Sequence, residues 1–593
     1  LKDGKLTANE YDSDYEGLVW VPYSYGVTGT ENLFGGSYTV DCTDKEVKVQ
    51  YRLALTNFGK ETYTYGQLAQ QIAKYHILFK EVGISKGDKV ALYARNSAEW
   101  VIAYYATLTY GAVTVPFLPD FLGSAVAELA SFSGCRLLIA DDIAVNALKG
   151  DSVNFSRMTE VKDFVGVINI KGFDVVYAAD ESLTDVCADI EERYTALYPN
   201  GMSATDVNYY NNSFDMEDVA EISFTSGTTS ATSKGVVLPA RSLSVNLEIG
   251  FSIVPECVGG HIFAILPMAH MFGQAFDVLF PLSSGCHVFV MPGKPTPARL
   301  IGGLGAVKPF MFLTVPMVIE KIFKSKVFPA TRAFPAKLLL KIPGLDRIVL
   351  RKIRNSLLNA FGNGFTTGLI IGGAALNREV EDLLKRMKFP YVVGYGMTEC
   401  APLITYENWK KYLYRSCGKG IVGMELRIDS EDPAKKEGEL QVHGVNVMMG
   451  YYKNEQATKE TFTEDGWMRT GDLGIIDKHG NLFLRGRSKN MLLGPSGQNI
   501  YPEEIEDKLN SLPLVLESVV VQRDQKLVAL VYPDNSDAGK KLLAGRNIFD
   551  VMEENRKELN KQIPQYSQVS AIEVVEKEFE KTPKRSIKHF LYS

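Results

Sequence analysis

Cysteine is scarce in this sequence, and its few copies show no pairing pattern. The 593 residues include 7 cysteines, which are widely scattered and form no Cys-x-x-Cys pair. A disulfide framework or a cysteine-based zinc site would need an even or closely spaced set. Both are therefore excluded, and we expect reduced thiols in a cytoplasmic protein.

Long hydrophobic runs and an excess of positive charge are missing as well. The best apolar run, residues 100–117, is broken by Thr107, Thr109, Gly111 and Thr114, whereas a membrane-spanning helix needs about 20 mostly apolar residues. We therefore expect neither a transmembrane helix nor a signal peptide. The 64 Lys and Arg residues are outnumbered by 70 Asp and Glu residues, which gives a net charge of −6. This balance argues against nucleic acid as a general partner, because no overall basic field exists to bind phosphates.

The sequence does contain enough apolar material for large buried sheets, since 46% of its residues are hydrophobic. A chain of 593 residues is too long for one core, so two or more domains are expected. From about residue 88, short β-rich apolar runs alternate with helix-length segments. Such runs are typical of parallel strands covered on both faces, and they comprise residues 90–93, 137–140, 165–168, 262–266, 288–291, 310–314, 369–371 and 391–393.

The pattern changes toward the C-terminus. After about residue 420 the strands alternate polar and apolar residues, and the last hundred residues predict helices at 502–511 and 548–562 and strands at 516–521, 526–532 and 570–575. The predicted fold class is therefore α/β, with a large N-terminal domain of parallel or mixed sheets covered by helices, a small β-barrel-like part and a small α+β C-terminal domain. The expected boundaries are 54–486 and 487–593, because the polar, glycine-bearing segment 486–497 suits a hinge. Residues 1–53 stay unassigned.

A loop rich in small hydroxyl residues follows the strand-like segment 221–224. Its sequence, Thr225-Ser-Gly-Thr-Thr-Ser-Ala-Thr-Ser-Lys234-Gly235, lets backbone N–H groups and hydroxyls converge on phosphate oxygens while one lysine adds positive charge. It does not match the P-loop pattern, which occurs nowhere in the chain. The alternative interpretation is a flexible Ser/Thr linker.

Two further motifs carry nucleotide-binding chemistry. In Gly394-Tyr-Gly-Met-Thr-Glu399 an aromatic ring could stack on a base, a hydroxyl could reach a phosphate and a carboxylate could hold Mg²⁺. In Gly466-Trp-Met-Arg-Thr-Gly-Asp472 a buried carboxylate could accept two ribose hydroxyls. A plain strand-to-turn element and an Asx-type turn are the respective alternatives.

Taken together and in this order, the three motifs resemble the adenylate-forming superfamily of acyl-CoA synthetases, luciferases and peptide-synthetase adenylation domains. Within it, the chain is most similar to bacterial long-chain fatty acid–CoA ligases. The resemblance runs from about Ala54 to the C-terminus and includes Ala98-Glu-Trp, Tyr110-Gly-Ala, Val115-Pro116, Leu266-Pro-Met-Ala-His270, Val315-Pro316, Gly372-Gly-Ala374, Gly486-Arg-Ser-Lys489 and Tyr501-Pro-Glu-Glu-Ile-Glu506.

The resemblance implies a role for each matched residue. The ATP phosphates would be held by Thr225, Ser226, Gly227, Thr228, Thr229 and Lys234. The adenine would be lined by Gly373, Ala374 and Tyr395, with Thr398 at the α-phosphate, Asp472 at the ribose and Arg487 beside the nucleotide, and Gly396 is a further nucleotide-binding residue. Glu399 would hold Mg²⁺, and His270 would lie where carboxylate, nucleotide and acyl channel meet, its alternative being a structural histidine. The implied co-substrate is coenzyme A, approaching past Gly497, and the C-terminal domain would be a mobile lid that rotates about Lys489.

The sequence departs from the family pattern in three places. The phosphate loop carries Ser230-Ala-Thr-Ser233 in place of a shorter Gly-x-Pro, and the family's usual N-terminal helix is not recognisable before residue 54. Ser586 occupies the slot of the usual catalytic lysine near the C-terminus. Lys584 and Lys588 lie two residues away on either side and, in an extended segment, would face the same way; we favour Lys584 as the catalytic replacement.

Two features bear on the acyl substrate and its source. Apolar residues near His270 could wall a fatty-acyl channel or simply form core; these are Phe272, Phe276, Val278, Leu279 and Phe280. Residues 321–354 contain ten Lys or Arg and one acid, interleaved with large apolar residues. Such a stretch suits peripheral contact with an anionic membrane, although a solvated helical face is an equal alternative.

The predicted function is therefore ATP-dependent activation of a long-chain fatty acid as acyl-AMP, followed by transfer to coenzyme A. One alternative is transfer to a carrier protein supplied in trans, because no carrier domain is recognisable. Another is a nucleotide- or acyl-binding protein whose turnover is impaired by the change at Ser586. The oligomeric state is left open.

Overall fold

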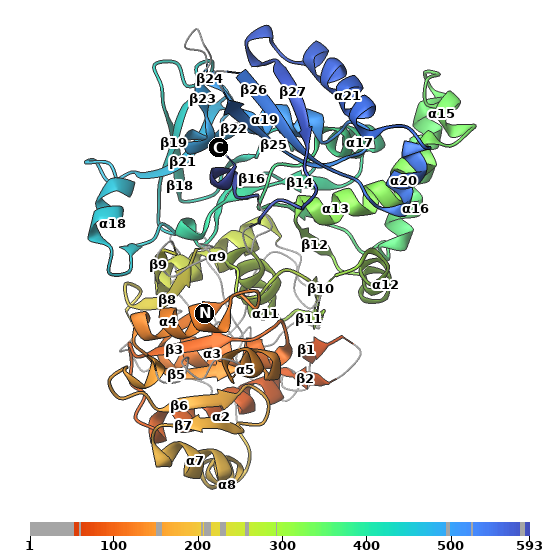
Figure 1. Ribbon diagram of the computed structural model, residues 1–593. Coiled ribbons are helices and arrows are strands. Elements are labelled where there is room, and N and C mark those ends of the chain that lie inside the picture. The colour runs from red at the N-terminus through yellow and green to blue at the C-terminus, as the bar shows by residue number, and fades with distance from the viewer. Residues whose placement is uncertain are drawn as a thin grey trace.

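The computed structural model describes residues 53–58, 61–149, 157–202, 206, 215–225, 233–254, 260–291, 293, 295–493, 499–523, 526–581 and 587–592. Its largest sheet has eight strands in the order β20-β9-β8-β4-β3-β5-β6-β7 (Figure 1). The five central strands β8 (Val219–Phe224), β4 (Val113–Phe117), β3 (Lys89–Tyr93), β5 (Cys135–Ala140) and β6 (Gly166–Asn169) are parallel. At the edges, β9 (Gly235–Pro239), β20 (Gly450–Tyr451) and β7 (Val175–Ala178) run antiparallel to their neighbours.

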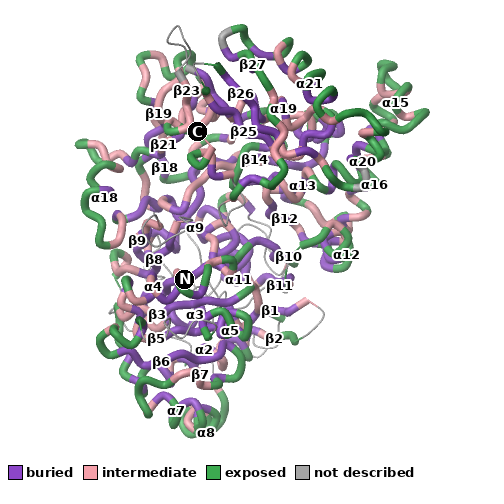
Figure 2. Tube along the Cα trace, viewed as in Figure 1, coloured by how far each residue is buried: buried purple, intermediate pink, exposed green. Residues whose placement is uncertain are grey.

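Both faces of this sheet are buried, as the near-continuous apolar strands predict. Along β3, Val90 and Leu92 belong to one hydrophobic core, whereas Ala91 and Tyr93 belong to a second core on the other face. Figure 2 shows the buried residues concentrated in the strands and in the helices between them. Helices α2 (Tyr65–Glu81), α3 (Ala98–Tyr110), α4 (Gly123–Ser133) and α5 (Asp142–Lys149) alternate with the strands along the chain.

The apolar run at residues 100–117 forms helix α3 and strand β4, both buried inside the protein. The Ser97 hydroxyl accepts a hydrogen bond from the Trp100 N–H (3.1 Å) and begins the helix. Gly111 ends it in the left-handed conformation, with φ of 83°. Across the described ranges, helices that combine the length and the apolar character needed to cross a bilayer are absent.

Two smaller sheets extend the large unit. One has the order β10-β11-β1-β2, built from β10 (His261–Ala264), β11 (His287–Val290), β1 (Leu53–Asn57) and β2 (Thr62–Thr64). The other is wholly parallel and consists of β12 (Met311–Thr314), β13 (Gly368–Ile371) and β14 (Tyr391–Val393). Helices α12 (Pro297–Val307), α13 (Pro316–Ile322), α16 (Leu345–Ala360) and α17 (Arg378–Met387) lie between these strands in the sequence.

The region after residue 394 is antiparallel, in agreement with its alternating pattern. Short strands β15 (Tyr395–Gly396), β16 (Leu403–Tyr406) and β17 (Lys419–Gly420) lead into a four-stranded sheet. That sheet has the order β18-β19-β21-β22 and is formed by β18 (Met424–Asp429), β19 (Gly438–Gly444), β21 (Met468–Ile476) and β22 (Leu482–Arg487).

The C-terminal unit has its own hydrophobic core. Strands β25 (Val515–Arg523), β26 (Lys526–Pro533) and β27 (Val569–Val574) form a sheet next to helices α19 (Pro502–Leu509) and α21 (Ile548–Gln562). Its core residues belong to clusters separate from those of the large unit. The α/β fold class with mixed sheets and a small α+β C-terminal part is confirmed, whereas the domain boundaries at 486 and 487 stay predictions; they fall at the last residues of β22.

Two adjacent glycines in α12 test how tightly the large core is packed. A Cβ on Gly303 would lie 2.2 Å from the Phe263 ring, while a Cβ on Gly302 would meet no atom within 4 Å. Gly303→Ala should therefore destabilise the protein by about 1–3 kcal/mol through overpacking. Gly302→Ala, the matched control, should be neutral or stabilising by up to about 1 kcal/mol, because alanine favours helix. Thermal and urea unfolding of both variants check this, and equal shifts would contradict it.

Candidate functional site

The three parallel strands β12, β13 and β14 place several of the predicted residues at one edge. Val315 follows β12, Gly373 and Ala374 follow β13, and Tyr395 follows β14. Because the strands are parallel and adjacent, their carboxyl ends share one edge of the sheet, where ligands bind in open α/β sheets. Gly373 and Ala374 are exposed there, and Gly373 adopts a φ of 90°, which favours glycine.

Thr225 and Lys234 lie side by side at the base of the predicted phosphate loop. The Thr225 N–H donates to the Lys234 carbonyl (2.9 Å), and the Lys234 N–H lies 3.3 Å from the Thr225 hydroxyl. This pairing continues the antiparallel ladder between β8 and β9, so the loop is closed at its neck as a hairpin. Ser226, Gly227, Thr228 and Thr229 lie outside the described residues, and their phosphate contacts stay predictions.

Lys234 is linked to Glu399 through Tyr451, a residue that the motif analysis missed. The Lys234 ammonium lies 4.5 Å from the centre of the Tyr451 ring, a cation–π contact. The Tyr451 hydroxyl donates to Glu399 Oε1 (3.0 Å), and burial raises the pKa of Tyr451 with a further contribution from Glu399. Tyr451 is paired with Val236 across β20 and β9, a long-range pairing that no local pattern around residue 451 indicates.

Tyr395, Asp472 and Arg487 form a second polar cluster. The Tyr395 hydroxyl donates to Asp472 Oδ2 (2.6 Å), and Arg487 Nε lies 3.1 Å from Asp472 Oδ1. Asp472 and Arg487 are direct cross-strand partners on β21 and β22, which explains why two positions 15 residues apart meet. Burial raises the pKa of the Asp472 carboxyl, and the neighbouring Arg487 opposes that rise.

This cluster has acceptors and donors suited to a ribose. Asp472 is buried, with 7% of its surface exposed, whereas the side chain of Arg487 is 64% exposed. Burial, together with the Asp472 charge, raises the pKa of Tyr395 well above its usual range, so the phenol stays a hydrogen-bond donor. An ionised carboxylate held between a phenol and a guanidinium can accept hydroxyl donors from a ligand.

Glycine is required sterically at position 396. A Cβ there would lie 2.1 Å from the Pro402 carbonyl oxygen, because β15 and β16 approach closely. Thr398 and Glu399 follow directly in the short 3-10 helix Thr398–Cys400, and Thr398 is buried. The motif at 394–399 therefore forms a tight strand–turn element that presents Tyr395 toward Asp472 and Glu399 toward Tyr451.

His270 begins the short helix α10 (Met271–Gly273) after strand β10. Its Nδ1 accepts a hydrogen bond from the Phe272 N–H (3.2 Å), so part of its chemistry is structural. A π-helix, Gln274–Leu279, continues the chain. The predicted acyl-channel residues Phe276, Val278, Leu279 and Phe280 are buried in the core, with the Phe280 ring against Gly250. The described contacts thus support the core interpretation for Phe280.

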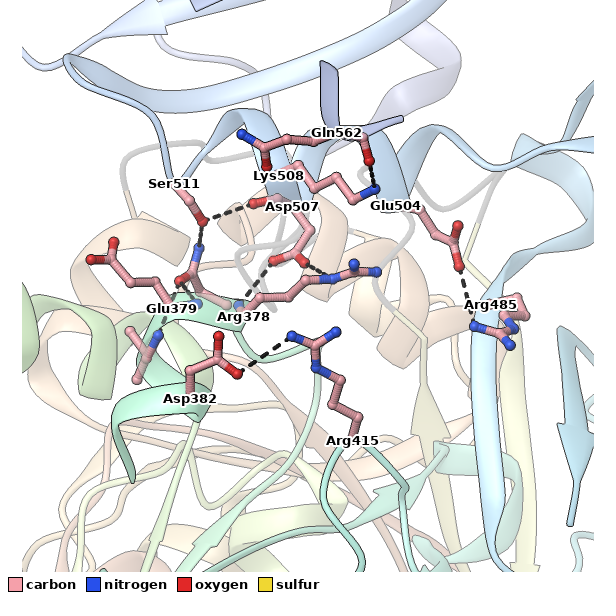
Figure 3. A network of polar contacts seen from close by, with 12 residues as sticks. Arg378, Glu379, Asp382, Arg415, Arg485, Glu504, Asp507, Lys508, Ser511 and Gln562 are labelled. Atoms are coloured by element: carbon pink, nitrogen blue, oxygen red, sulfur yellow. Dashed lines mark hydrogen bonds and ion pairs between the residues drawn. The ribbon is translucent and has the colours of Figure 1, made fainter. Parts of the chain in front are cut away.

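The C-terminal unit contacts the large unit through polar residues of α19 and α17 (Figure 3). The loop of Gly373 and Ala374 leads to Asn377, whose Nδ2 donates to Ser511 Oγ (2.9 Å). Next to it, Arg378 Nε lies 2.7 Å from Asp507 Oδ2. Asp507 belongs to α19, and Ser511 follows the C-cap of that helix. Polar contacts therefore connect α19 and the residues after it to the N-terminal end of α17.

Helix α19 also places Glu503 near Asn490 and Arg487. Asn490 Nδ2 donates to Glu503 Oε1 (2.6 Å). The charges of Asp472 and, more weakly, Glu503 raise the pKa of Arg487. Lys489, the predicted hinge residue, lies in the 3-10 helix Ser488–Asn490 between β22 and the C-terminal unit. Its position is consistent with the polar connection that the sequence indicates; its hinge role stays a prediction.

The described residues on either side of the slot predicted for a catalytic lysine form several contacts. Lys581 and Ile587 form an antiparallel bridge, and Lys581 Nζ lies 2.5 Å from Glu517 Oε1. Lys588, the alternative to Lys584, has a side chain only 7% exposed and pairs with Glu580 (3.2 Å). Because its side chain is buried and paired with Glu580, Lys588 is disfavoured as the lysine that contacts the nucleotide. Lys584 and Ser586 lie outside the described residues.

His589 helps to hold this C-terminal segment in place. Its Nε2 lies 2.9 Å from Glu506 Oε2 on α19. Although burial alone would lower it, the hydrogen bond and charge of Glu506 raise the pKa of His589 to about 8. The pair thus joins α19, which contacts the large unit, to the residues that follow the predicted catalytic segment.

The residues present fit a Mg²⁺ ion shared with substrate phosphates. Within the described part of the chain, clusters of three or more His, Cys, Asp or Glu that could form a complete metal cage are absent. Mg²⁺ typically uses one or two carboxylates together with phosphates and water. Glu399, which already accepts one hydrogen bond from Tyr451, offers the single carboxylate that such a site needs.

Comparison with known proteins agrees with this arrangement. The profile of the AMP-binding enzyme family matches residues 44–452. A long-chain-fatty-acid–CoA ligase of Mycobacterium bovis is 28% identical over 489 residues, covering 77% of this chain and 75% of the relative. A chloroplastic long-chain-fatty-acid–[acyl-carrier-protein] ligase of Arabidopsis thaliana is 25% identical over 551 residues, covering 80% of this chain and 73% of the relative.

The fold has close counterparts among solved structures. ATP-bound MatB from Rhodopseudomonas palustris superimposes with a TM-score of 0.70 at 20% identity, covering 92% of this chain and 95% of that protein. At that identity the likeness concerns the fold alone. The family match spans more than half of the chain, residues 44–452. The chain therefore belongs to the family of AMP-binding enzymes and is an adenylate-forming, acyl-activating enzyme.

Proposed function

We propose that this enzyme is a long-chain fatty acid–CoA ligase. Two polar clusters carry the proposal: Lys234–Tyr451–Glu399 offers groups for phosphates and Mg²⁺, and Tyr395–Asp472–Arg487 offers groups for a ribose. Besides burial, the charge of Glu399 contributes to the raised pKa of Asp472, so the two clusters interact electrostatically. The long-chain substrate rests on the 28% identical Mycobacterium bovis relative, which carries that name.

The proposed reaction has two steps. The substrate carboxylate attacks the α-phosphorus of ATP, forming acyl-AMP and displacing pyrophosphate. Lys234 and the loop N–H groups neutralise the charge that develops on the leaving phosphates, while Asp472 and Tyr395 hold the nucleotide in line with the attacking oxygen. The CoA thiolate then attacks the acyl carbon and AMP leaves. Glu399 would hold Mg²⁺, which when bound would supply further charge neutralisation at the phosphates.

A carrier-protein thiol is the second candidate acceptor. The Arabidopsis thaliana relative at 25% identity is a ligase of this kind, and the adenylation step would be the same. For either acceptor, a long-chain acid is drawn from lipid-rich surroundings, and we propose that residues 321–354 bring the enzyme to an anionic membrane.

The first prediction concerns the substrates. With Mg²⁺, ATP, palmitate and CoA we expect AMP, pyrophosphate and palmitoyl-CoA, measured by pyrophosphate release and by mass spectrometry of the thioester. Holo-acyl carrier protein in place of CoA separates the two acceptors. Much faster turnover of acetate or benzoate would contradict the long-chain assignment, and absence of pyrophosphate with every acid would leave only a binding protein.

The second prediction concerns the two clusters. Glu399→Ala and Asp472→Ala should each slow acyl-AMP formation, with a loss of about 2–4 kcal/mol in transition-state stabilisation. Tyr451→Phe keeps the ring beneath Lys234 but removes the hydrogen bond to Glu399, so its loss should be smaller. Glu431→Ala, which removes an exposed acid paired with Lys436, is the matched control. Single-turnover adenylation and circular dichroism are measured together; normal adenylation by a folded variant would refute the role of that residue.

The third prediction separates Lys584 from Lys489. Lys584→Ala should slow acyl-AMP formation at least about tenfold, equal to about 1.4 kcal/mol, because a cation near the α-phosphate is lost, while thiolysis of pre-formed acyl-AMP survives. Lys489→Pro should do the reverse, since proline restricts φ and removes an N–H at the proposed hinge. Lys588→Ala and Ser586→Lys complete the set.

The opposite outcomes are equally clear. Normal adenylation by both lysine-to-alanine variants, with no gain in Ser586→Lys, would mean that the enzyme needs no lysine in this segment. Equal loss of both half-reactions in Lys489→Pro would mean that residue 489 is not the pivot.

A further inference from the structure

Residues 332–354 form a projecting surface, here called the α15–α16 tip, that exposes large apolar side chains. It comprises the end of α14 (Phe328–Arg332), helix α15 (Ala336–Leu339) and the first half of α16. Figure 1 shows α15 standing away from the body of the protein, and Figure 2 shows that this region is largely exposed. None of the α15 residues is buried, which is unusual for a helix whose sequence includes two leucines.

Five large apolar residues of the tip are strongly exposed within a short stretch. The exposed fractions are 82% for Phe334, 52% for Leu338, 41% for Ile342, 39% for Leu345 and 64% for Ile348. Scattered exposed apolar side chains are normal, but a contiguous group marks an interaction site. Because α15 stands away from the body of the protein, a flat or soft partner such as a membrane surface can reach it.

The apolar residues of α16 occupy a defined face. Leu345 and Ile348 are three residues apart and therefore lie on one side of the helix, together with Lys352. Leu350 and Leu357 are buried on the side that packs against the protein. The helix thus has one apolar face toward the core and a second, mixed apolar and basic face toward solvent.

Positive charge surrounds the exposed apolar group. Lys337, Lys341, Arg347, Arg351 and Lys352 are all exposed. Within the described residues, none of these five lies within ion-pair distance of a carboxylate. Arg332, at the start of the tip, forms an ion pair with Glu379. Asp346 is the one acid among residues 321–354, and it accepts a hydrogen bond from the Gly344 N–H (3.0 Å).

We propose that the α15–α16 tip docks on the surface of an anionic lipid bilayer, with Phe334, Leu338 and Ile348 entering the interface and the basic residues contacting lipid headgroups. Apolar side chains flanked by Lys and Arg on a short amphipathic segment are the features of interfacial membrane binding. Anionic headgroups complement unpaired basic side chains, and the effect falls off within a Debye length. This inference rests on the proposed function only for the reason why the enzyme would dock, which is access to a fatty acid dissolved in the membrane.

The experiment is vesicle flotation with the purified full chain. Vesicles of equal parts phosphatidylcholine and phosphatidylglycerol are compared with phosphatidylcholine alone, at low and high salt. The charge variant combines Lys337→Gln, Lys341→Gln, Arg351→Gln and Lys352→Gln. The apolar variant combines Phe334→Ser and Leu338→Gln. The matched control, Leu542→Gln with Phe549→Ser, removes two residues of similar exposure, 59% and 63%, from the C-terminal unit.

The two variants should fail in different ways. The wild type and the control should float with anionic vesicles. The charge variant should bind at least about tenfold more weakly and lose its salt dependence, because the electrostatic contribution is gone. The apolar variant should keep salt-dependent binding but lose the fraction that resists high salt, because that fraction comes from apolar insertion.

Other results would overturn the proposal. Equal flotation of both variants and the wild type, or no flotation of the wild type, would exclude the tip as a membrane surface. Loss of binding to an acidic carrier protein in the charge variant, without vesicle binding by the wild type, would assign the tip to a protein partner instead. Pyrophosphate release from palmitate, measured on the same samples in detergent, keeps the reaction separate: turnover without flotation refutes the tip alone, and flotation without turnover refutes the reaction alone.

Discussion

The buried carboxylate of Asp472 joins three segments of the large unit. It lies on β21, accepts a hydrogen bond from Tyr395 on β15, and pairs with Arg487, the last residue of β22. Burial of a carboxylate is unfavourable, as its raised pKa indicates, and removing one partner would leave a charge without compensation. The three segments are therefore held in one relative arrangement, in which a ribose could meet the acid.

The cluster of Lys234, Tyr451 and Glu399 also joins distant segments, but through weaker contacts. Lys234 at the neck of the phosphate loop, Tyr451 on an edge strand and Glu399 in a tight turn come from segments more than fifty residues apart. The tyrosine ring faces the cation while its hydroxyl binds the acid. The Lys234 ammonium and the Glu399 carboxylate are thus linked through Tyr451 without a direct Lys–Glu ion pair, which would occupy both groups.

Helix α19 connects the C-terminal unit to the large unit. Its N-terminal end brings Glu503 near Arg487, and its C-terminal half pairs Asp507 with Arg378 at the N-terminal end of α17. His589, held by Glu506 of the same helix, anchors the residues after the predicted catalytic segment. Helix α19 therefore contacts the N-terminal end of α17 and the C-terminal segment, and its charge acts on Arg487, so a displacement of the C-terminal unit would change all three interactions.

The sequence by itself determined the class of fold and the nucleotide motifs. Apolar runs such as 90–93 and 391–393 are strands because alternate side chains must be buried on both faces, and glycine at 396 is dictated by a close backbone approach that a motif can reveal. The tertiary structure alone decided the rest. Tyr451 reaches Glu399 because its strand pairs with a strand more than two hundred residues away. Lys588 forms an ion pair with Glu580. The tip at 332–354 exposes its apolar residues rather than burying them. These outcomes depend on contacts between residues far apart in the sequence, and local sequence patterns do not predict such contacts.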